Sequence, residues 1–367
     1  MSRYYYYLLI LNMLANITVF TPKLLLEKRT NGMIGSLIIA VILGITFLWI
    51  ITKIFIKFPG RGLPELLESY TPKWFAKLYL LGAGLTWYVA GITTLIGYSF
   101  LSKRYLNPDM SLTMIVSIFL VVITFGILMK SQKVLYALEF ALALCAPIII
   151  VIIIKASFSD SMNWEIARMP FTYYRNLPSY ETISVAMFSV LGYINISIFN
   201  REWKKPQKLK IGPIAGIGLL AFINLLTTTL IPIGFNGIDG VGDIVYPWIF
   251  TSDSIRMEFF FLERVFIMFL LLYLVISLIS MVIHWHVGFQ FLMGFSTFPF
   301  IKWKKHQLGK YVYIAFFWIA SIQIVNRIPE FQAISFIKLY LSLIIPYITF
   351  MVLLLFFIVR KVKKNEA

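Results

Sequence analysis

The chain has 367 residues, of which 60% are hydrophobic and 13% charged, with a mean hydropathy of +0.84. This composition excludes an ordinary water-soluble domain and is typical of a membrane-spanning protein. The net charge of +17 does not indicate a nucleic-acid partner, because the basic residues stand beside apolar stretches, where they contact lipid headgroups. The single Cys145 and three scattered histidines predict no disulfide, no metal site and no cofactor.

Ten apolar stretches follow one another, each long enough to cross the roughly 30 Å hydrocarbon core as a helix. Backbone amides in lipid must bond within their own segment, so these stretches predict helices and no sheet. The expected spans are 5–21, 33–56, 76–100, 110–130, 134–155, 181–200, 211–235, 262–295, 311–326 and 333–359.

The first expected span carries an unusual group of small and polar residues, which includes Ala15, Asn16 and Thr18. The apolar start of the chain resembles a signal peptide, but no small-x-small cleavage site follows, so we expect it to be retained as this span. The loop 58–69 contains two prolines and predicts a short interfacial helix on the inner side.

Two side chains in the next spans are candidates for function. Tyr88 lies midway along span 76–100, where it either lines a pocket or packs between helices. Glu139 lies five residues into span 134–155, and a carboxylate at membrane depth is costly. It either relays protons or pairs with Lys130 or Lys133 near the inner face.

Span 181–200 contains Ser189, Gly192 and Tyr193, a group that favours a break in the helix. The alternative is that such polar residues only bond between helices. The loop 243–252 predicts a second interfacial segment, on the outer side. His284 and His286 are expected near the inner end of span eight, with no acid or base at mid-membrane in spans one, six or eight. We expect Lys338 to reach the outer headgroups.

Positive charge alternates from one loop to the next. With the N-terminus inside, 21 of the 33 basic residues fall on inner segments and 11 on outer ones, and Lys338 lies within a span. Lys and Arg stay on the cytoplasmic side during insertion, so both termini are predicted to be cytoplasmic.

Ten helices form two groups of five, and an odd-numbered repeat is inverted in the membrane. We therefore predict an all-α integral membrane protein with a 5+5 inverted-repeat transporter fold and broken helices 1 and 6. The chain forms one transmembrane domain: halves 1–155 and 181–360, an outer loop 156–180 and a basic tail 361–367. The predicted mid-membrane ligand site comprises Ala15, Asn16, Thr18, Tyr88, Ser189, Gly192 and Tyr193.

Three stretches give the chain a family resemblance. They are Phe58-Pro59-Gly60 with the following 63–68 and 73–79, the Lys/Pro-rich 201–206, and Leu262-Glu263-Arg264. In order and spacing they resemble the spore germination permease family, the B subunits of bacterial spore germinant receptors, within the amino acid–polyamine–organocation superfamily. The resemblance covers nearly the whole chain.

The resemblance implies a germinant-receptor subunit of the spore inner membrane that senses a small nutrient such as an amino acid. It also implies A-type and C-type subunits as partners. Two alternatives stay open: an amino-acid permease, and a structural membrane subunit without ligand binding. No nucleophile–base pair stands at membrane depth in the sequence, so we do not expect an enzyme.

Overall fold

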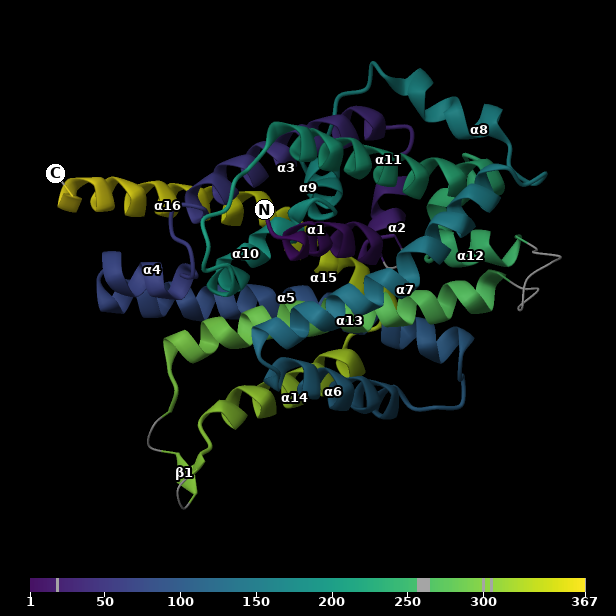
Figure 1. Cartoon of the computed structure of the whole chain (residues 1–367). Coiled ribbons are helices and arrows are strands. Elements are labelled where there is room, and N and C mark those ends of the chain that lie inside the picture. Colours follow the sequence, from purple (N-terminus) through teal and green to yellow (C-terminus); the bar gives the residue numbers. More distant parts are fainter. Residues whose placement is uncertain (18–19, 256–264, 299–300, 304–305, 367) are drawn as a thin grey trace.

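The computed structural model describes residues 1–17, 20–255, 265–298, 301–303 and 306–366 (Figure 1). In this part of the chain six helices are long and apolar enough to cross a membrane, or up to eight if two bent pairs each count as one span. The six are α3 (Met33–Phe55), α5 (Lys73–Tyr105), α7 (Ser131–Ser157), α11 (Ile211–Asn236), α13 (Val265–Phe295), and α15 (Glu330–Ser342) with α16 (Ile344–Glu366).

Helices also form at the expected fourth and ninth spans, as α6 (Leu112–Leu128) and α14 (Lys310–Arg327). The first is shorter than a typical span and the second is flanked by basic residues. The all-helical membrane architecture is thus confirmed, while the number of ten spans and the inverted halves stay predictions. The start of the expected span eight, at 262–264, lies outside the described residues.

The centre of the bundle is the pair α5 and α13, whose most apolar windows are 67% buried against 33–44% for the other long helices. Glycines on α5 make room for large side chains of α13. A Cβ on Gly91 would lie 2.1 Å from the Trp285 indole nitrogen, and one on Gly84 would lie 2.6 Å from Leu292. Close approach at small residues is how helices pack where lipid removes the hydrophobic drive to associate.

The outer helices expose large apolar side chains, such as Phe140 on α7, Ile42 on α3 and Leu353 on α16. In water such a surface would associate, whereas in a bilayer it meets lipid tails. The exposed apolar residues therefore mark the membrane-facing side of the bundle.

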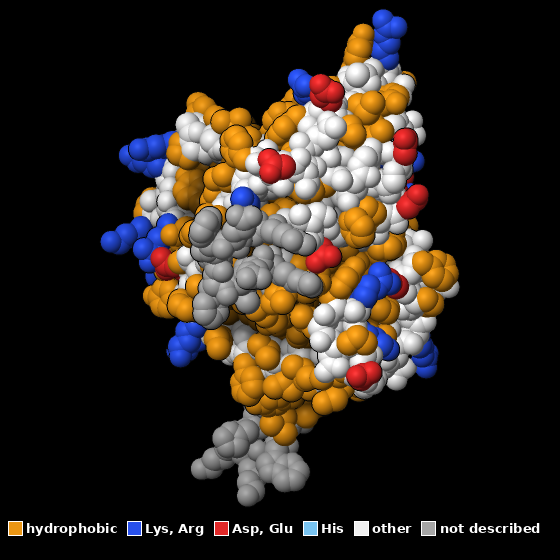
Figure 2. All heavy atoms as spheres, turned by 90° about the vertical axis from the view of Figure 1, so that its right-hand side faces the viewer, with side chains coloured by type: hydrophobic (Ala, Val, Ile, Leu, Met, Phe, Trp, Pro, Cys, Tyr) orange, Lys and Arg blue, Asp and Glu red, His pale blue; other side chains and the backbone are white. Residues whose placement is uncertain are grey.

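Short helices lie at the two ends of the long ones. In Figure 1, α4 (Leu63–Tyr70) and the end of α16 lie at the left, whereas α8 (Trp164–Arg168) and α12 (Pro247–Asp253) lie at the right. Figure 2 looks onto this right-hand end, where acidic and basic side chains both reach the surface between apolar ones. Helices are thus present in both loops where the sequence predicts them.

The helix α4 has a strong start signal. Gly62 is its N-cap, Pro64 lies in its first turn, and the Gly62 amide donates to the Glu65 carboxylate over 2.8 Å. This side chain satisfies an amide that no helical carbonyl can reach. The cap also fixes the position of Glu65.

A two-residue strand pair departs from the expectation of helices alone. β1 (Lys302–Trp303) pairs antiparallel with β2 (His306–Gln307) between α13 and α14. Outside the hydrocarbon core the backbone is free to bond to water or to another strand, so the rule that forbids sheets in lipid does not apply.

Two charged groups near span ends have partners that the sequence did not indicate. Glu139 pairs with Arg3 at 3.0 Å and accepts a hydrogen bond from the Tyr4 hydroxyl, so the expected pairing with Lys130 or Lys133 is wrong. Lys338 bonds Glu181 at 2.6 Å. Both pairs join helices that are distant in the sequence, and they neutralise charge close to the apolar surface.

Candidate functional site

Two bent helix pairs face each other inside the bundle. α1 (Arg3–Ala15) and α2 (Phe20–Leu26) make an angle of 62°. α9 (Tyr180–Phe188) makes an angle of 61° with the segment Leu191–Glu202, formed by η2 (Leu191–Asn195), α10 (Ile196–Phe199) and η3 (Asn200–Glu202). The bends occur where the sequence predicts breaks in spans one and six. Thr18 lies outside the described residues.

Gly192 lets the two broken spans touch. A Cβ on this residue would lie 2.2 Å from the Leu8 carbonyl oxygen and 2.8 Å from the Leu9 Cα. A glycine is therefore needed for close approach of two backbones rather than for a positive φ.

Two asparagine side chains bind backbone carbonyls at the breaks. The Asn12 amide donates to the carbonyl of Phe188, at the end of α9. Asn16 donates to the Asn12 carbonyl over 2.6 Å and accepts a hydrogen bond from Thr21 over 3.2 Å, which spans the break between α1 and α2. Such bonds supply the partners that water would provide outside the membrane.

Between the breaks lies a cavity of about 30 Å³. Its walls come from both bent pairs and from α5, α13 and α15: Asn12, Ala15, Asn16, Phe20, Thr21, Thr93, Thr94, Phe188, Ser280, His284, Ile337 and Leu341. A second cavity of about 20 Å³ shares Phe188 and His284 with the first, and its other walls are largely apolar, including Trp87 and Tyr340. The larger cavity has the more polar wall and the smaller one the more apolar wall.

Both cavities are small, and we call this arrangement of the bundle the contracted state. A water molecule needs about 10–15 Å³, so the larger cavity has room for about two waters and not for an amino acid. A ligand of that size enters only if the bent pairs or their neighbours move apart.

His284 brings an acceptor to the wall that the two cavities share. Its Nδ1 lies 2.7 Å from the Ser280 carbonyl, and because a carbonyl only accepts, Nδ1 carries the proton. Nε2 has no hydrogen-bond partner within the described part of the chain. The expectation that His284 lies near the end of span eight is wrong, because it stands well inside α13, beside both breaks.

Of the residues predicted from sequence, Ala15 and Asn16 line the cavity. Ser189 is buried beside the break, where its amide bonds the Ala186 carbonyl. Gly192 lies against α1, as described above. Tyr193 is fully buried next to the break and is not among the cavity walls.

Tyr88 points to another part of the bundle. Its hydroxyl lies 3.0 Å from the Ser321 hydroxyl on α14, and its ring stacks on Trp285 with 5.4 Å between centroids. This side chain joins α5, α13 and α14, and it is not among the walls of either cavity.

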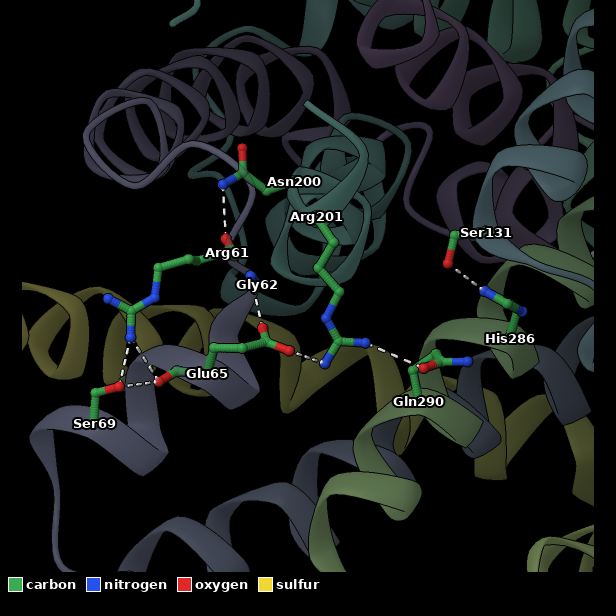
Figure 3. A network of polar contacts seen from close by, with 9 residues as sticks. All are labelled: Arg61, Gly62, Glu65, Ser69, Ser131, Asn200, Arg201, His286 and Gln290. Carbon is green, nitrogen blue, oxygen red and sulfur yellow. Dashed lines mark hydrogen bonds and ion pairs between the residues drawn. The ribbon is translucent and has the colours of Figure 1, made fainter. Parts of the chain in front are cut away.

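An ionic cluster joins the end of the second bent pair to α4 and α13 (Figure 3). Arg201, in η3, bonds Glu65 of α4 at 2.8 Å and donates to the Gln290 side chain of α13 over 3.1 Å. Asn200 donates to the carbonyls of Phe58 and Arg61, over 2.8 and 2.7 Å. We call Glu65, Asn200, Arg201 and Gln290 the inner cluster.

His286 ties α13 to the neighbouring helices close to the inner cluster (Figure 3). Its Nε2 lies 2.9 Å from the Ser131 hydroxyl and its Nδ1 donates to the Ile127 carbonyl over 3.0 Å. Its ring stacks on Phe199 of α10. His284 and His286 thus face different neighbours, and only His284 lines a cavity.

Polar contacts also hold the first bent pair, at the end of the bundle opposite to α4. Arg29, just after α2, donates to the carbonyls of Ile238 and Asp239, the latter over 2.7 Å, and Lys23 donates to the carbonyl of Gly242. These contacts tie α2 to η4 (Gly240–Asp243), the segment that precedes α12. Polar contacts therefore hold the bent pairs at both ends of the bundle.

A family model for spore germination protein matches residues 2–329, which are 328 of the 367. The chain belongs to the spore germination protein family. The family resemblance seen in the sequence is thereby confirmed. No curated protein matches the chain at a significant level.

In this spore germination protein, two of the three stretches that suggested the family meet in the inner cluster. The stretch 63–68 forms most of α4 and supplies Glu65, and the stretch 201–206 begins with Arg201. The third, Leu262-Glu263-Arg264, lies outside the described residues. Spacing along the chain did not show that the first two are in contact.

Proposed function

We propose that this protein is the membrane subunit of a spore germinant receptor. A small nutrient, of which an amino acid is the best example, binds between the two bent pairs and triggers germination through A-type and C-type partner subunits. The proposal includes ten spans in two inverted halves, cytoplasmic termini and the spore inner membrane as location. It assigns no enzymatic role.

The observation that carries the proposal is the cavity where both breaks meet. Polar groups of Asn16, Thr93 and His284 surround the larger compartment, and Trp87 and Tyr340 line the smaller one. An amino acid has a polar head and, in many cases, an apolar side chain, so it matches this pair of compartments. Ligand pockets combine apolar walls with a few placed polar groups in this way.

Binding would favour an expanded state over the contracted one, and it can do so only by its difference in affinity for the two. The contacts at the two ends resist that expansion. Ligand that fills both compartments is expected to weaken one set of end contacts and so pass a change of shape to the partners.

One specific observation supports a second candidate, an amino-acid permease. His284 lines both cavities, and a histidine in a transporter can carry the coupled proton. The same fold serves a receptor and a transporter, so only transport itself separates them.

The test is equilibrium binding of a labelled amino-acid panel to the purified chain in proteoliposomes, with uptake measured in the same vesicles. The site variant is Thr93→Val, and its matched control is Thr46→Val. Both hydroxyls bond a carbonyl of their own helix, but Thr93 lines the cavity and Thr46 is exposed on α3.

Binding without accumulation, weakened by Thr93→Val and unchanged by Thr46→Val, supports the receptor. Accumulation above background that requires Thr93 identifies a permease instead. Absence of binding to every amino acid in the panel would contradict the proposed ligand class and favour a structural subunit.

A further inference from the structure

A separate groove lies at the end of the bundle that carries α4. Its volume is about 450 Å³, more than ten times that of either internal cavity. The loop between α3 and α4, Tyr70 of α4 and the last turns of α16 form its walls: Lys57, Phe58, Pro59, Arg61, Tyr70, Val359, Val362 and Lys363. Its size is that of an ordinary ligand pocket.

The charges of the groove have one sign. Lys57, Arg61 and Lys363 bring three cations to it, and the described residues that line it include no Asp or Glu. The Glu65 carboxylate of α4 is directed toward Arg201, with which it is paired (Figure 3). Three cations without a counter-charge repel one another, so an anion in the groove is favoured.

Arg61 is oriented before any ligand arrives. Its Nη2 donates to the Glu65 carbonyl over 3.2 Å and to the Ser69 hydroxyl, and its guanidinium lies 5.7 Å from the centre of the Tyr70 ring. Lys361 donates to the Tyr70 carbonyl over 3.2 Å, which holds the end of α16 against α4. The remaining guanidinium N–H groups suit phosphate oxygens.

The groove lies at the level where hydrocarbon gives way to headgroups. Lys57 follows the last residue of α3 by two positions, and Lys363 is in the last turn of α16, so each stands at the end of a membrane-spanning helix. Phe58, Pro59, Val359 and Val362 supply apolar walls. Phe356, three residues before Val359, is exposed and continues the apolar surface toward the bundle's lipid-facing side.

We propose that this groove binds the phosphate headgroup of an anionic phospholipid, with Lys57, Arg61 and Lys363 on the phosphate and the acyl chains along α16. Basic pockets between spans at the membrane surface bind acidic lipids in this way. An acidic peptide would match the cations equally well, but it has no need of an apolar path that leads along a helix into the bilayer. The apolar wall therefore favours a lipid.

A bound lipid would brace the end of α16 against the loop that leads into α4. Because α4 also carries Glu65 of the inner cluster, the lipid is expected to stabilise the contracted state. This inference does not depend on the identity of the nutrient.

The experiment uses the full chain in detergent micelles, titrated with phosphatidylglycerol or phosphatidylcholine. Retained lipid is counted by native mass spectrometry, and the thermal unfolding midpoint is followed in parallel. The groove variant is Lys57→Gln with Lys363→Gln, both of which are exposed positions. The control, Lys130→Gln with Lys133→Gln, removes the same charge from exposed positions outside the groove.

We expect phosphatidylglycerol to be retained and to raise the midpoint, and phosphatidylcholine to do neither. The groove variant should weaken phosphatidylglycerol binding roughly 30-fold, as about 1 kcal/mol for each basic residue implies, whereas the control should bind as the unaltered chain does. Added salt should weaken binding.

Three results would overturn the proposal. Equal losses in both double variants would mean a diffuse surface effect. Competition by inorganic phosphate at the same concentration as the lipid would assign the site to a free anion. Binding of an acidic peptide in preference to phosphatidylglycerol would make the groove a protein-docking site.

Discussion

Gly192→Ala places one methyl group where the two broken spans touch. The new Cβ would lie 2.2 Å from the Leu8 carbonyl oxygen, and ordinary contacts begin at 3.4 Å, so α1 and η2 must separate by 3.4 − 2.2 = 1.2 Å or the bend must change. The near atoms belong to the backbone, so no side chain can rotate away.

Overpacking of this kind costs about 1–3 kcal/mol. With about 2.1 cal/mol/K of unfolding entropy per residue, a 367-residue chain loses roughly 1–4 °C from its thermal midpoint. Because the displaced segments carry the cavity, we expect the midpoint to fall and amino-acid binding to weaken by at least tenfold.

The matched control is Gly216→Ala in α11, where a Cβ would meet no atom within 4 Å. There alanine should leave binding unchanged and add up to about 1 kcal/mol of stability, since it favours the helix and restricts the unfolded chain. Both variants are compared by thermal unfolding in detergent and by equilibrium binding. Equal midpoints and equal affinities would refute the close approach of the breaks.

Four further substitutions separate binding from stability. His284→Leu should weaken amino-acid binding about fivefold, because one hydrogen bond contributes about 1 kcal/mol. His286→Leu should lower the thermal unfolding midpoint and leave amino-acid binding unchanged. Asn200→Ala removes the hydrogen bonds of 2.8 and 2.7 Å to the carbonyls of Phe58 and Arg61. It should lower the free energy of unfolding, measured with denaturant, by about 1–3 kcal/mol, whereas Asn107→Ala at an exposed position should leave it unchanged. Glu65→Gln should cost under about 1 kcal/mol, because the Glu65 side chain is 40% exposed, and should abolish part of the salt dependence of the unfolding midpoint.

Hydropathy and local chemistry were sufficient to predict the helices and the two bends. Asn16 and Gly192 are unusual in apolar spans, and their local roles follow from residue type: an amide that binds a freed carbonyl and a glycine that allows close approach. The start of α4 was equally visible, because its proline and Glu65 form a local capping pattern.

Contacts between distant helices were not predictable in the same way. Tyr88 lies midway along its span, as expected, but its direction depends on the rotation of α5 against α13 and α14. The partner of Glu139 is Arg3, 136 residues away in the sequence. His284 was misplaced because α13 has 31 residues, longer than the roughly 20 that cross a bilayer, so its depth did not follow from distance to the helix end.

The two ends of the bundle hold the bent pairs through different chemistry, and this difference bears on how a ligand signal would leave the cavity. At one end Lys23 and Arg29 bind backbone carbonyls, which bear partial charges and have no net charge to lose. At the other end Arg201 bonds a full carboxylate that is itself partly exposed to solvent. Solvent screens an ion pair and competes for both partners, so the Arg201–Glu65 pair opens at lower cost than the contacts of Lys23 and Arg29. Expansion of the cavity is therefore expected to open the Arg201–Glu65 pair first, next to the groove for anionic lipid, while the Asn200 hydrogen bonds keep η3 on the loop before α4.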